Sequence, residues 1–301
     1  MRPHHLALPA LILASLIGGS GGIAIKLALL RFGPFTLLFL RFLFASLIIS
    51  PLITTRFPRL TSHFLRTNLL LSAFFAGNVL LYVIGIQWTT AITATLMYTL
   101  TPIIIAILTH YRRRHETITS NQWLGFILGI IGATIIISRS FSSGKDIFLS
   151  VGTPQGNLFI LAAVISYSLF LYFSQVATRH YSPLILTGVN FYFTTLLASP
   201  FALWEITRHQ AYQFPLTFTN LGALTYIVLF LTLAMYFLYQ WGTKHSSSLI
   251  AGSTVYLGPL VASALAIPIL GERLTPHLIF GGMAILIGVY LAQSHSLKRS
   301  F

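Results

Sequence analysis

The sequence predicts an all-α integral membrane protein whose ten transmembrane helices form two five-helix inverted-topology repeats. Three observations support this prediction: the composition, ten apolar segments and an internal repeat. The 301 residues are 55% hydrophobic and only 7% charged, with a mean hydropathy of +0.83, whereas soluble domains carry about 25% charged residues. This composition excludes an ordinary soluble enzyme and also intrinsic disorder. The absence of cysteine excludes disulfides, thiolate metal sites and a cysteine nucleophile.

Ten segments are long and apolar enough to cross a bilayer, which takes about 20 residues. They lack the strict alternation of apolar and polar residues that is typical of outer-membrane strands. The first segment has features of a signal peptide, but nine further spans favour a retained helix. The connecting segments are too short to form a soluble domain. The predicted spans cover residues 6–30, 35–54, 68–87, 91–110, 121–138, 156–177, 184–204, 221–242, 246–268 and 276–293.

The basic residues predict the orientation. A net charge of +14 would ordinarily suggest nucleic acid binding, but in membrane proteins Lys and Arg gather in cytoplasmic loops. With the N-terminus in the cytoplasm, eleven basic residues lie in inside loops and tails and five lie outside. The clearest inside clusters are at residues 56–66 and 112–114. We therefore expect two cytoplasmic termini and no nucleic acid partner.

An internal repeat divides the chain into residues 6–140 and residues 155–294. Each half holds five spans, and because five is odd the second half begins on the opposite side of the membrane. Inverted repeats are typical of secondary transporters, with a substrate site near the midplane between the halves. The matching pairs, at offsets of 149, 157 and 156 residues in turn, include Pro34/Pro183, Phe42/Phe191, Ser50/Ser199, Tyr82/Tyr239, Pro102/Pro259, Glu116/Glu272 and Gly132/Gly288.

A set of residues at particular places in the spans points to a known family. They are Ala24, Ile25, Lys26, Pro34, Arg41, Ala91, Ala94, Pro102 and the run Gly271, Glu272, Arg273, Leu274, Thr275 before a glycine-rich last span. In these residues the chain resembles the EamA-type permeases, with two EamA repeats, of the ten-helix drug/metabolite transporter superfamily. The first half keeps a degraded copy of the run at residues 115–119, and Asn190 replaces the match of Arg41. The resemblance implies an inner-membrane permease, often an exporter of amino acids or other small metabolites, and does not specify the substrate.

Lys26 and Arg41 are the only basic residues inside predicted spans, where a charge costs several kcal/mol. We expect no Asp or Glu within a span core to pair with them. One interpretation is that Lys26 extends toward the outer interface while Arg41 donates hydrogen bonds to helix carbonyls. The other is that one of the two binds a substrate carboxylate or phosphate.

The chain has four acidic residues, Glu116, Asp146, Glu205 and Glu272, and all lie in loops or at span ends. Proton-coupled transporters often relay protons through a carboxylate within the membrane. No acidic residue is expected to be buried in such a place here. The sequence therefore favours facilitated diffusion or exchange over proton antiport.

Pro102 and Pro259 lie mid-span at matching places, where each removes a donor and clashes with the carbonyl four residues earlier. They are candidate hinges, because interrupted helices at matching positions indicate a binding site; static kinks are the alternative. Polar and aromatic side chains of the inner spans either line a substrate cavity or pack between helices. With the two cations, the candidates are Lys26, Arg41, Asn78, Tyr82, Tyr98, Tyr167, Gln175, Asn190, Tyr236, Gln240 and Tyr256.

Glycines at positions 125, 129 and 132 fit close helix packing, at the interface between halves or in a dimer. The run from Gly18 to Gly22 fits a flexible gate or a close helix crossing.

Together these features predict a bacterial inner-membrane permease that moves small organic metabolites, amino acids or related compounds, by alternating access. A multidrug or nucleotide-sugar exporter is the alternative. An integral-membrane lipid-modifying enzyme is the rival class, but the acidic residues that it would cluster at one face are scattered here. We expect no catalysis, no cofactor and no metal site. The expected partners are the bilayer and a small-molecule substrate, in a monomer or homodimer.

Overall fold

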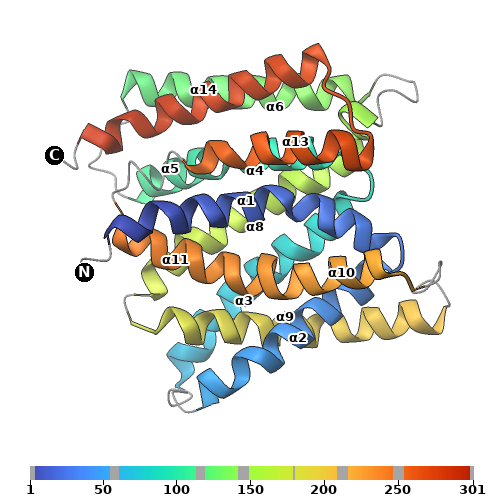
Figure 1. The fold of residues 1–301 in the computed structure, drawn as a ribbon. Helices are drawn as coiled ribbons and strands as arrows, with labels where there is room; N and C mark the ends of the chain where they lie inside the picture. Colours follow the sequence, from blue (N-terminus) through green and yellow to red (C-terminus); the bar gives the residue numbers. More distant parts are fainter. Residues whose placement is uncertain are drawn as a thin grey trace.

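The computed structural model describes residues 4–54, 61–112, 119–141, 149–178, 180–208, 216–246 and 254–298. In this part of the chain the helices lie side by side across the view, and the two ends of the chain lie at the same end of the molecule (Figure 1). The helices are α1 (His4–Leu29), α2 (Pro34–Thr54), α3 (Ser62–Gly85), α4 (Ala91–Tyr98), α5 (Thr101–Arg112), α6 (Ser120–Arg139), α8 (Pro154–Ala177), α9 (Pro183–Thr207), α10 (Phe218–Tyr226), η1 (Ile227–Ala234), α11 (Met235–His245), η2 (Thr254–Tyr256), α13 (Leu257–Leu270) and α14 (Pro276–Lys298).

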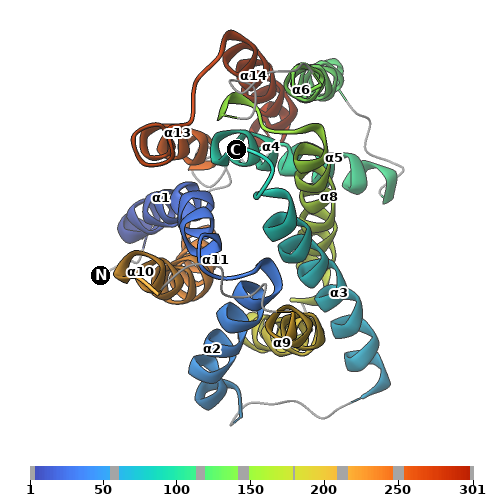
Figure 2. The same ribbon diagram turned by 90° about the vertical axis from the view of Figure 1, so that its right-hand side faces the viewer.

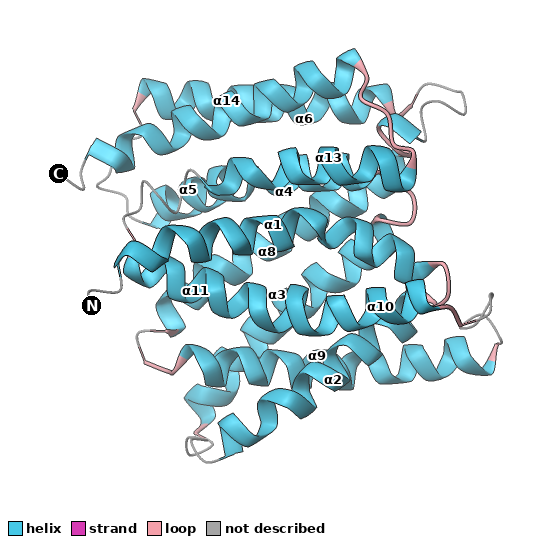
Figure 3. Cartoon of the chain, in the orientation of Figure 1, coloured by secondary structure: helices cyan, strands magenta, loops and turns pink. Residues whose placement is uncertain are grey.

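The predicted all-helical membrane fold is confirmed. Among the described residues, nine helical segments are long and apolar enough to cross a membrane, and α13 is a shorter apolar helix. The same residues contain no β-strand (Figure 3). The predicted ninth span, 246–268, includes residues 247–253, which lie outside the described part of the chain.

The fifth and tenth spans, α6 and α14, form a tightly packed pair along their lengths. A Cβ on Gly125 would lie 2.5 Å from the carbonyl oxygen of Gly288, and one on Gly132 would lie 2.4 Å from that of Gly281. The start of each helix therefore faces the later part of the other, so the pair is antiparallel. Because α6 and α14 are equivalent in the repeat, their antiparallel packing inverts one half relative to the other. The glycines serve the interface between halves.

The second and seventh spans, α2 and α9, form the other such pair. The rings of Phe42 and Phe191 lie 5.4 Å apart between centroids, and Ser46 Oγ lies 3.4 Å from Thr195 Oγ1. Both contacts join residues separated by 149 positions, which is the offset of the repeat in this block. Equivalent residues therefore meet at a pseudo-two-fold axis.

The first helix of each half packs with the opposite half. Helix α1 contacts α10, α11 and α13, whereas α8 contacts α3, α4 and α5. Viewed along the helices, these two bundles flank the molecule, with the α6/α14 pair at the top and the α2/α9 pair at the bottom (Figure 2). Neither half of the sequence therefore forms a separate compact unit.

The fourth span breaks at Thr99–Leu100, between α4 and α5. Pro102 consequently lies in the first turn of α5, where its missing N–H would be unpaired in any helix. The ninth span has a 3₁₀ turn, η2, at the corresponding place, and Pro259 is the third residue of α13. The expected clash with carbonyls four residues earlier is therefore wrong, because each helix is interrupted before its proline. The matched interruptions themselves are present.

Replacing Gly132 by Ala should weaken the α6/α14 pair. The added Cβ would meet a backbone oxygen at 2.4 Å, which can yield only if the helices separate, and such overpacking destabilises by about 1–3 kcal/mol. The measurement is thermal unfolding in detergent. The control is Gly222→Ala, because a Cβ there meets nothing within 4 Å. Equal melting temperatures for the two variants would contradict this packing.

Candidate functional site

A cavity of about 660 Å³ lies between the two bundles and is lined by both halves of the chain. Its volume is within the range of small-molecule sites, roughly 300–1,000 Å³. Of the sequence candidates, six side chains and both prolines line it: Arg41, Asn78, Tyr82, Tyr98, Tyr167, Tyr236, Pro102 and Pro259. The structure thus brings these residues, from three spans of the first half and three of the second, around one space.

The cavity extends along the membrane-spanning direction toward the end where the termini lie. On α5 and α6 the lining reaches His110 and Gln122, and on α14 it reaches Gln293. On the other side it stops at Ile25 of α1 and Thr95 of α4. Between Thr95 and His110 the chain rises about 20 Å at 1.5 Å per residue. The cavity is therefore deep and approached from one end of the bundle.

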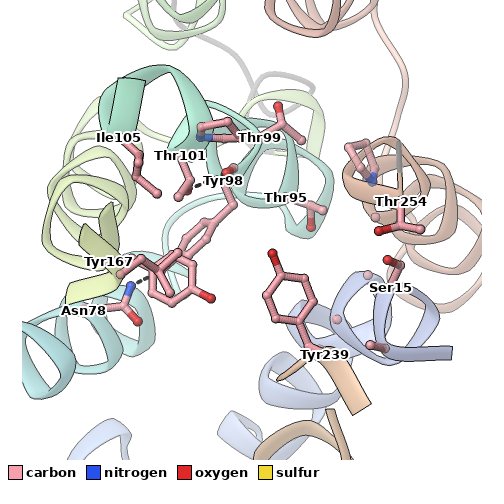
Figure 4. Close-up of a pocket in the computed structure, with 18 of the residues that line it drawn as sticks. Ser15, Asn78, Thr95, Tyr98, Thr99, Thr101, Ile105, Tyr167, Tyr239 and Thr254 are labelled. Atoms are coloured by element: carbon pink, nitrogen blue, oxygen red, sulfur yellow. Dashed lines mark hydrogen bonds between the residues drawn. The ribbon is translucent and has the colours of Figure 1, made fainter. Parts of the chain in front are cut away.

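Tyrosines of both halves form its aromatic wall (Figure 4). Tyr98, at the end of α4, receives a hydrogen bond at its hydroxyl from Asn78 Nδ2 at 2.5 Å. Its ring packs edge-on against Tyr82, with centroids 5.5 Å apart, and lies 5.8 Å from Tyr167. The interruption after Tyr98 is fixed by Thr101, whose hydroxyl donates to the Tyr98 carbonyl at 2.7 Å. The broken helix thus places an aromatic and polar surface at the cavity.

Among the described residues of the lining, Arg41 is the one Lys or Arg side chain, and it is only 6% exposed. Its Nε donates to Thr232 Oγ1 at 2.7 Å, and its guanidinium lies 5.0 Å from the centroid of the Phe42 ring. The expectation that Arg41 donates to helix carbonyls is therefore wrong. Thr232 lies on η1, a π-helix that widens the eighth span at this point.

Lys26 lies outside the cavity, beyond its closed end. Its Nζ forms an ion pair with Glu272 Oε1 at 3.1 Å. Glu272, only 3% exposed, also accepts hydrogen bonds from the backbone N–H groups of Ala91 at 2.7 Å and Ile92 at 3.1 Å. These donors start α4, where a carboxylate is favoured by the helix dipole. The expectation that Lys26 has no acidic partner and extends toward the interface is therefore wrong.

The Gly271–Glu272–Arg273 run makes this contact possible. Gly271 ends α13 in the left-handed conformation at φ +67°, which suits glycine. The chain then turns so that Glu272 reaches α4, while the Arg273 N–H donates to the Leu149 carbonyl at 2.8 Å. The run thus ties together the segments at the closed end. Of its first-half copy at residues 115–119, the structure describes Thr119, and Glu116 lies outside the described residues.

Glu205 is a second buried carboxylate, also 3% exposed. It accepts from Phe35 N at 3.1 Å, Thr36 N at 2.7 Å and the Thr36 hydroxyl at 2.8 Å, at the start of α2. Glu205 and Glu272 lie at span ends, as expected, but both are buried there, which the sequence did not indicate. Both carboxylates satisfy helix N-termini, and Asp146 lies outside the described residues.

Other candidates lie away from the cavity lining. Gln175 is exposed, Asn190 is buried and accepts from Ser72 Oγ at 2.8 Å, and Tyr256 does not line the cavity. The side chain of Gln240 lies outside the described residues. The cavity is also lined by four residues that are not among the sequence candidates: Ser15, Thr95, Tyr239 and Thr254. Tyr239 carried a usable signal, since it is the repeat partner of Tyr82. The described residues contain no cluster of potential metal ligands.

Comparisons with known proteins agree with this architecture. The profile of the EamA-like transporter family matches residues 5–138 and 154–293. The chain is 31% identical to the uncharacterized transporter YetK of Bacillus subtilis over 288 residues, covering 93% of this chain and 84% of that protein. It is 24% identical to an uncharacterized transporter of Archaeoglobus fulgidus over 94% and 96% of the two chains. A crystal structure at 16% identity shares the fold, with a TM-score of 0.62 over 99% of this chain and 100% of that one.

Replacing Lys26 by Met should destabilise the closed end, because it leaves the Glu272 carboxylate without its countercharge. Breaking a buried pair typically costs about 3–5 kcal/mol, and we expect the lower value because Lys26 remains 19% exposed. Glu272→Gln should lower the stability by a similar amount, because it leaves the Lys26 ammonium group without its countercharge. The double variant should lose less stability than the two single losses added together. Additive losses in thermal unfolding would contradict a direct interaction.

Proposed function

Since this chain belongs to the EamA-like transporter family, we propose that it moves small organic metabolites across the membrane by alternating access. The observation that carries the proposal is the cavity between two inverted halves, to which both halves contribute lining residues. Such a site at a repeat interface, beside interrupted helices in matching positions, is the arrangement expected of a secondary transporter. Exchange of conformations between the halves then opens the site alternately to the two sides.

The described conformation has one open and one closed end. The closed end is held by Lys26, Glu272 and the start of α4. If the termini are cytoplasmic, as the basic residues favour, the cavity faces the cytoplasm of a bacterial cell through its inner membrane. In the opposite state the Lys26–Glu272 contact separates, and the cavity opens beyond Ile25.

Amino acids and related compounds are the proposed substrate class. The cavity volume of about 660 Å³ suits molecules of this size, and its tyrosines and hydroxyls can contact both apolar and polar groups. The two described carboxylates bond to helix N-termini, and no acidic side chain belongs to the described lining. This favours facilitated diffusion or exchange over proton antiport through a carboxylate.

The test is counterflow in proteoliposomes that contain the purified protein. Liposomes preloaded with an unlabelled amino acid or metabolite should accumulate the labelled compound transiently, without a proton gradient. Protein-free liposomes provide the background. Folded protein that gives no counterflow with any compound of a broad metabolite panel would contradict the proposal.

Cysteine labelling should detect the open end, because the chain has no native cysteine. Ser15 lines the cavity, so a charged, membrane-impermeant thiol reagent should modify Ser15→Cys from the side of the termini. The matched control is Leu16→Cys on the same helix, since Leu16 is 42% exposed away from the lining, a position that we expect to face lipid. Equal labelling of both positions would contradict an aqueous cavity at this place.

A further inference from the structure

The positive charge of Arg41 has no counter-ion in the described part of the chain. The side chain is 6% exposed, and its hydrogen bond goes to a neutral hydroxyl, that of Thr232. The two carboxylates that the structure describes are engaged elsewhere, Glu205 at the start of α2 and Glu272 with Lys26. A buried charge without a partner is destabilising, so its presence calls for a functional explanation.

The π-helix η1 sets how Arg41 is held. The Thr232 hydroxyl donates to the carbonyl of Ile227, five residues earlier, at 2.7 Å. With its proton used in this way, the hydroxyl oxygen accepts from Arg41 Nε at 2.7 Å. π-turns within helices occur frequently at functional sites. This one turns a threonine into a fixed acceptor for the inner nitrogen of the guanidinium.

The terminal Nη groups of Arg41 remain available to the cavity. Within the described residues they have no hydrogen-bond partner, and Arg41 belongs to the lining together with Tyr82, Tyr98 and Tyr236. The fork of an Arg side chain matches a carboxylate through two parallel hydrogen bonds. Tyr98 already accepts from Asn78, so its own hydroxyl proton is free to be donated to an anion.

The other residues of the lining indicate what net charge and what kind of apolar group the ligand has. Arg41 is the sole Lys or Arg among the described lining residues, so a second negative charge would lack a matching cation there. The same residues include no Asp or Glu to hold an ammonium group. Tyr82, Tyr98, Tyr167 and Tyr236 offer aromatic surface for an apolar group.

Within the proposed class of amino acids and related compounds, we propose that the preferred substrate is an organic monoanion without an ammonium group, with its carboxylate bound by Arg41 and its apolar or aromatic body packed against the tyrosines. This rests on the proposed function, because it takes the cavity as the substrate site. Arg41 is then a binding residue and Thr232 a positioning residue. Among compounds with the same apolar group, the carboxylate should bind more tightly than the zwitterionic amino acid, and the amine should bind least tightly.

The experiment measures binding to the full-length protein in nanodiscs by calorimetry and thermal shift. The probes are series of aryl- and alkyl-carboxylates of graded length, each with the matching amino acid and amine, such as 3-phenylpropanoate, phenylalanine and phenethylamine. We expect saturable binding within the carboxylate series alone or most strongly there. Binding by no carboxylate, or equal binding by the amine, overturns the proposal.

Arg41 variants separate a binding role from a structural one. Arg41→Gln should weaken carboxylate binding roughly 10- to 100-fold, the usual value of hydrogen bonds to charged groups, without lowering the melting temperature, because it removes an uncompensated charge. Arg41→Lys should bind with intermediate affinity, and Thr232→Val should weaken carboxylate binding more than amine binding. The control is Arg66→Gln, which removes a charge at an exposed position of α3. A lower melting temperature with unchanged affinity in Arg41→Gln overturns the proposal.

Counterflow and binding measured on the same Arg41→Gln variant test the anionic substrate separately from transport. Counterflow of neutral or cationic compounds that survives Arg41→Gln would retain the transport function and reject the anionic substrate. Carboxylate binding that Arg41→Gln abolishes, without counterflow of any bound compound, would support the site and reject transport.

Discussion

The close antiparallel packing of equivalent helices is the constraint on which the architecture depends. In α6 and α14, glycines allow the two backbones to approach so closely that a Cβ would overlap a carbonyl. In α2 and α9, Phe42 meets its own repeat partner Phe191. Apolar lipid gives little drive for helices to associate, so close van der Waals packing of small residues must hold the halves together. Between these two pairs, the bundle of α1, α10, α11 and α13 faces the bundle of α8, α3, α4 and α5 across the central cavity.

Buried charge is the second constraint. An ionised group within a membrane is costly, so it either pairs with other polar groups of the protein or takes part in function. Glu205 and Glu272 both take the same solution, in which a carboxylate satisfies the first N–H groups of a helix from the other half. Glu272 also neutralises Lys26. Arg41 stands apart, because it is oriented by a hydroxyl and has no carboxylate among the described residues. That difference separates the closed end, where the described charges are paired, from the Arg41 region, where the described residues offer only a neutral acceptor.

The helices depart from regular α-helical geometry beside the cavity. The break at Thr99–Leu100 and the turn η2 precede Pro102 and Pro259, and η1 carries Thr232. Within a bilayer, such departures from regular helix are tolerated only where the freed groups find partners or face a cavity. Here the departures adjoin the lining. The first two occur at matching places in the repeats, whereas the π-helix occurs in the second half and gives the two halves different chemistry.

The sequence by itself determined the helical membrane fold, the two inverted repeats, the matched interruptions and most of the aromatic wall, because hydropathy, prolines and repeat offsets are local signals. Only the tertiary structure decided how the charges are used. Lys26 and Glu272 are 246 positions apart, and a residue at a span end can be exposed or buried depending on which helix end packs above it. For the same reason Thr232 could not be identified: its role depends on a local π-turn and on a partner 191 residues away.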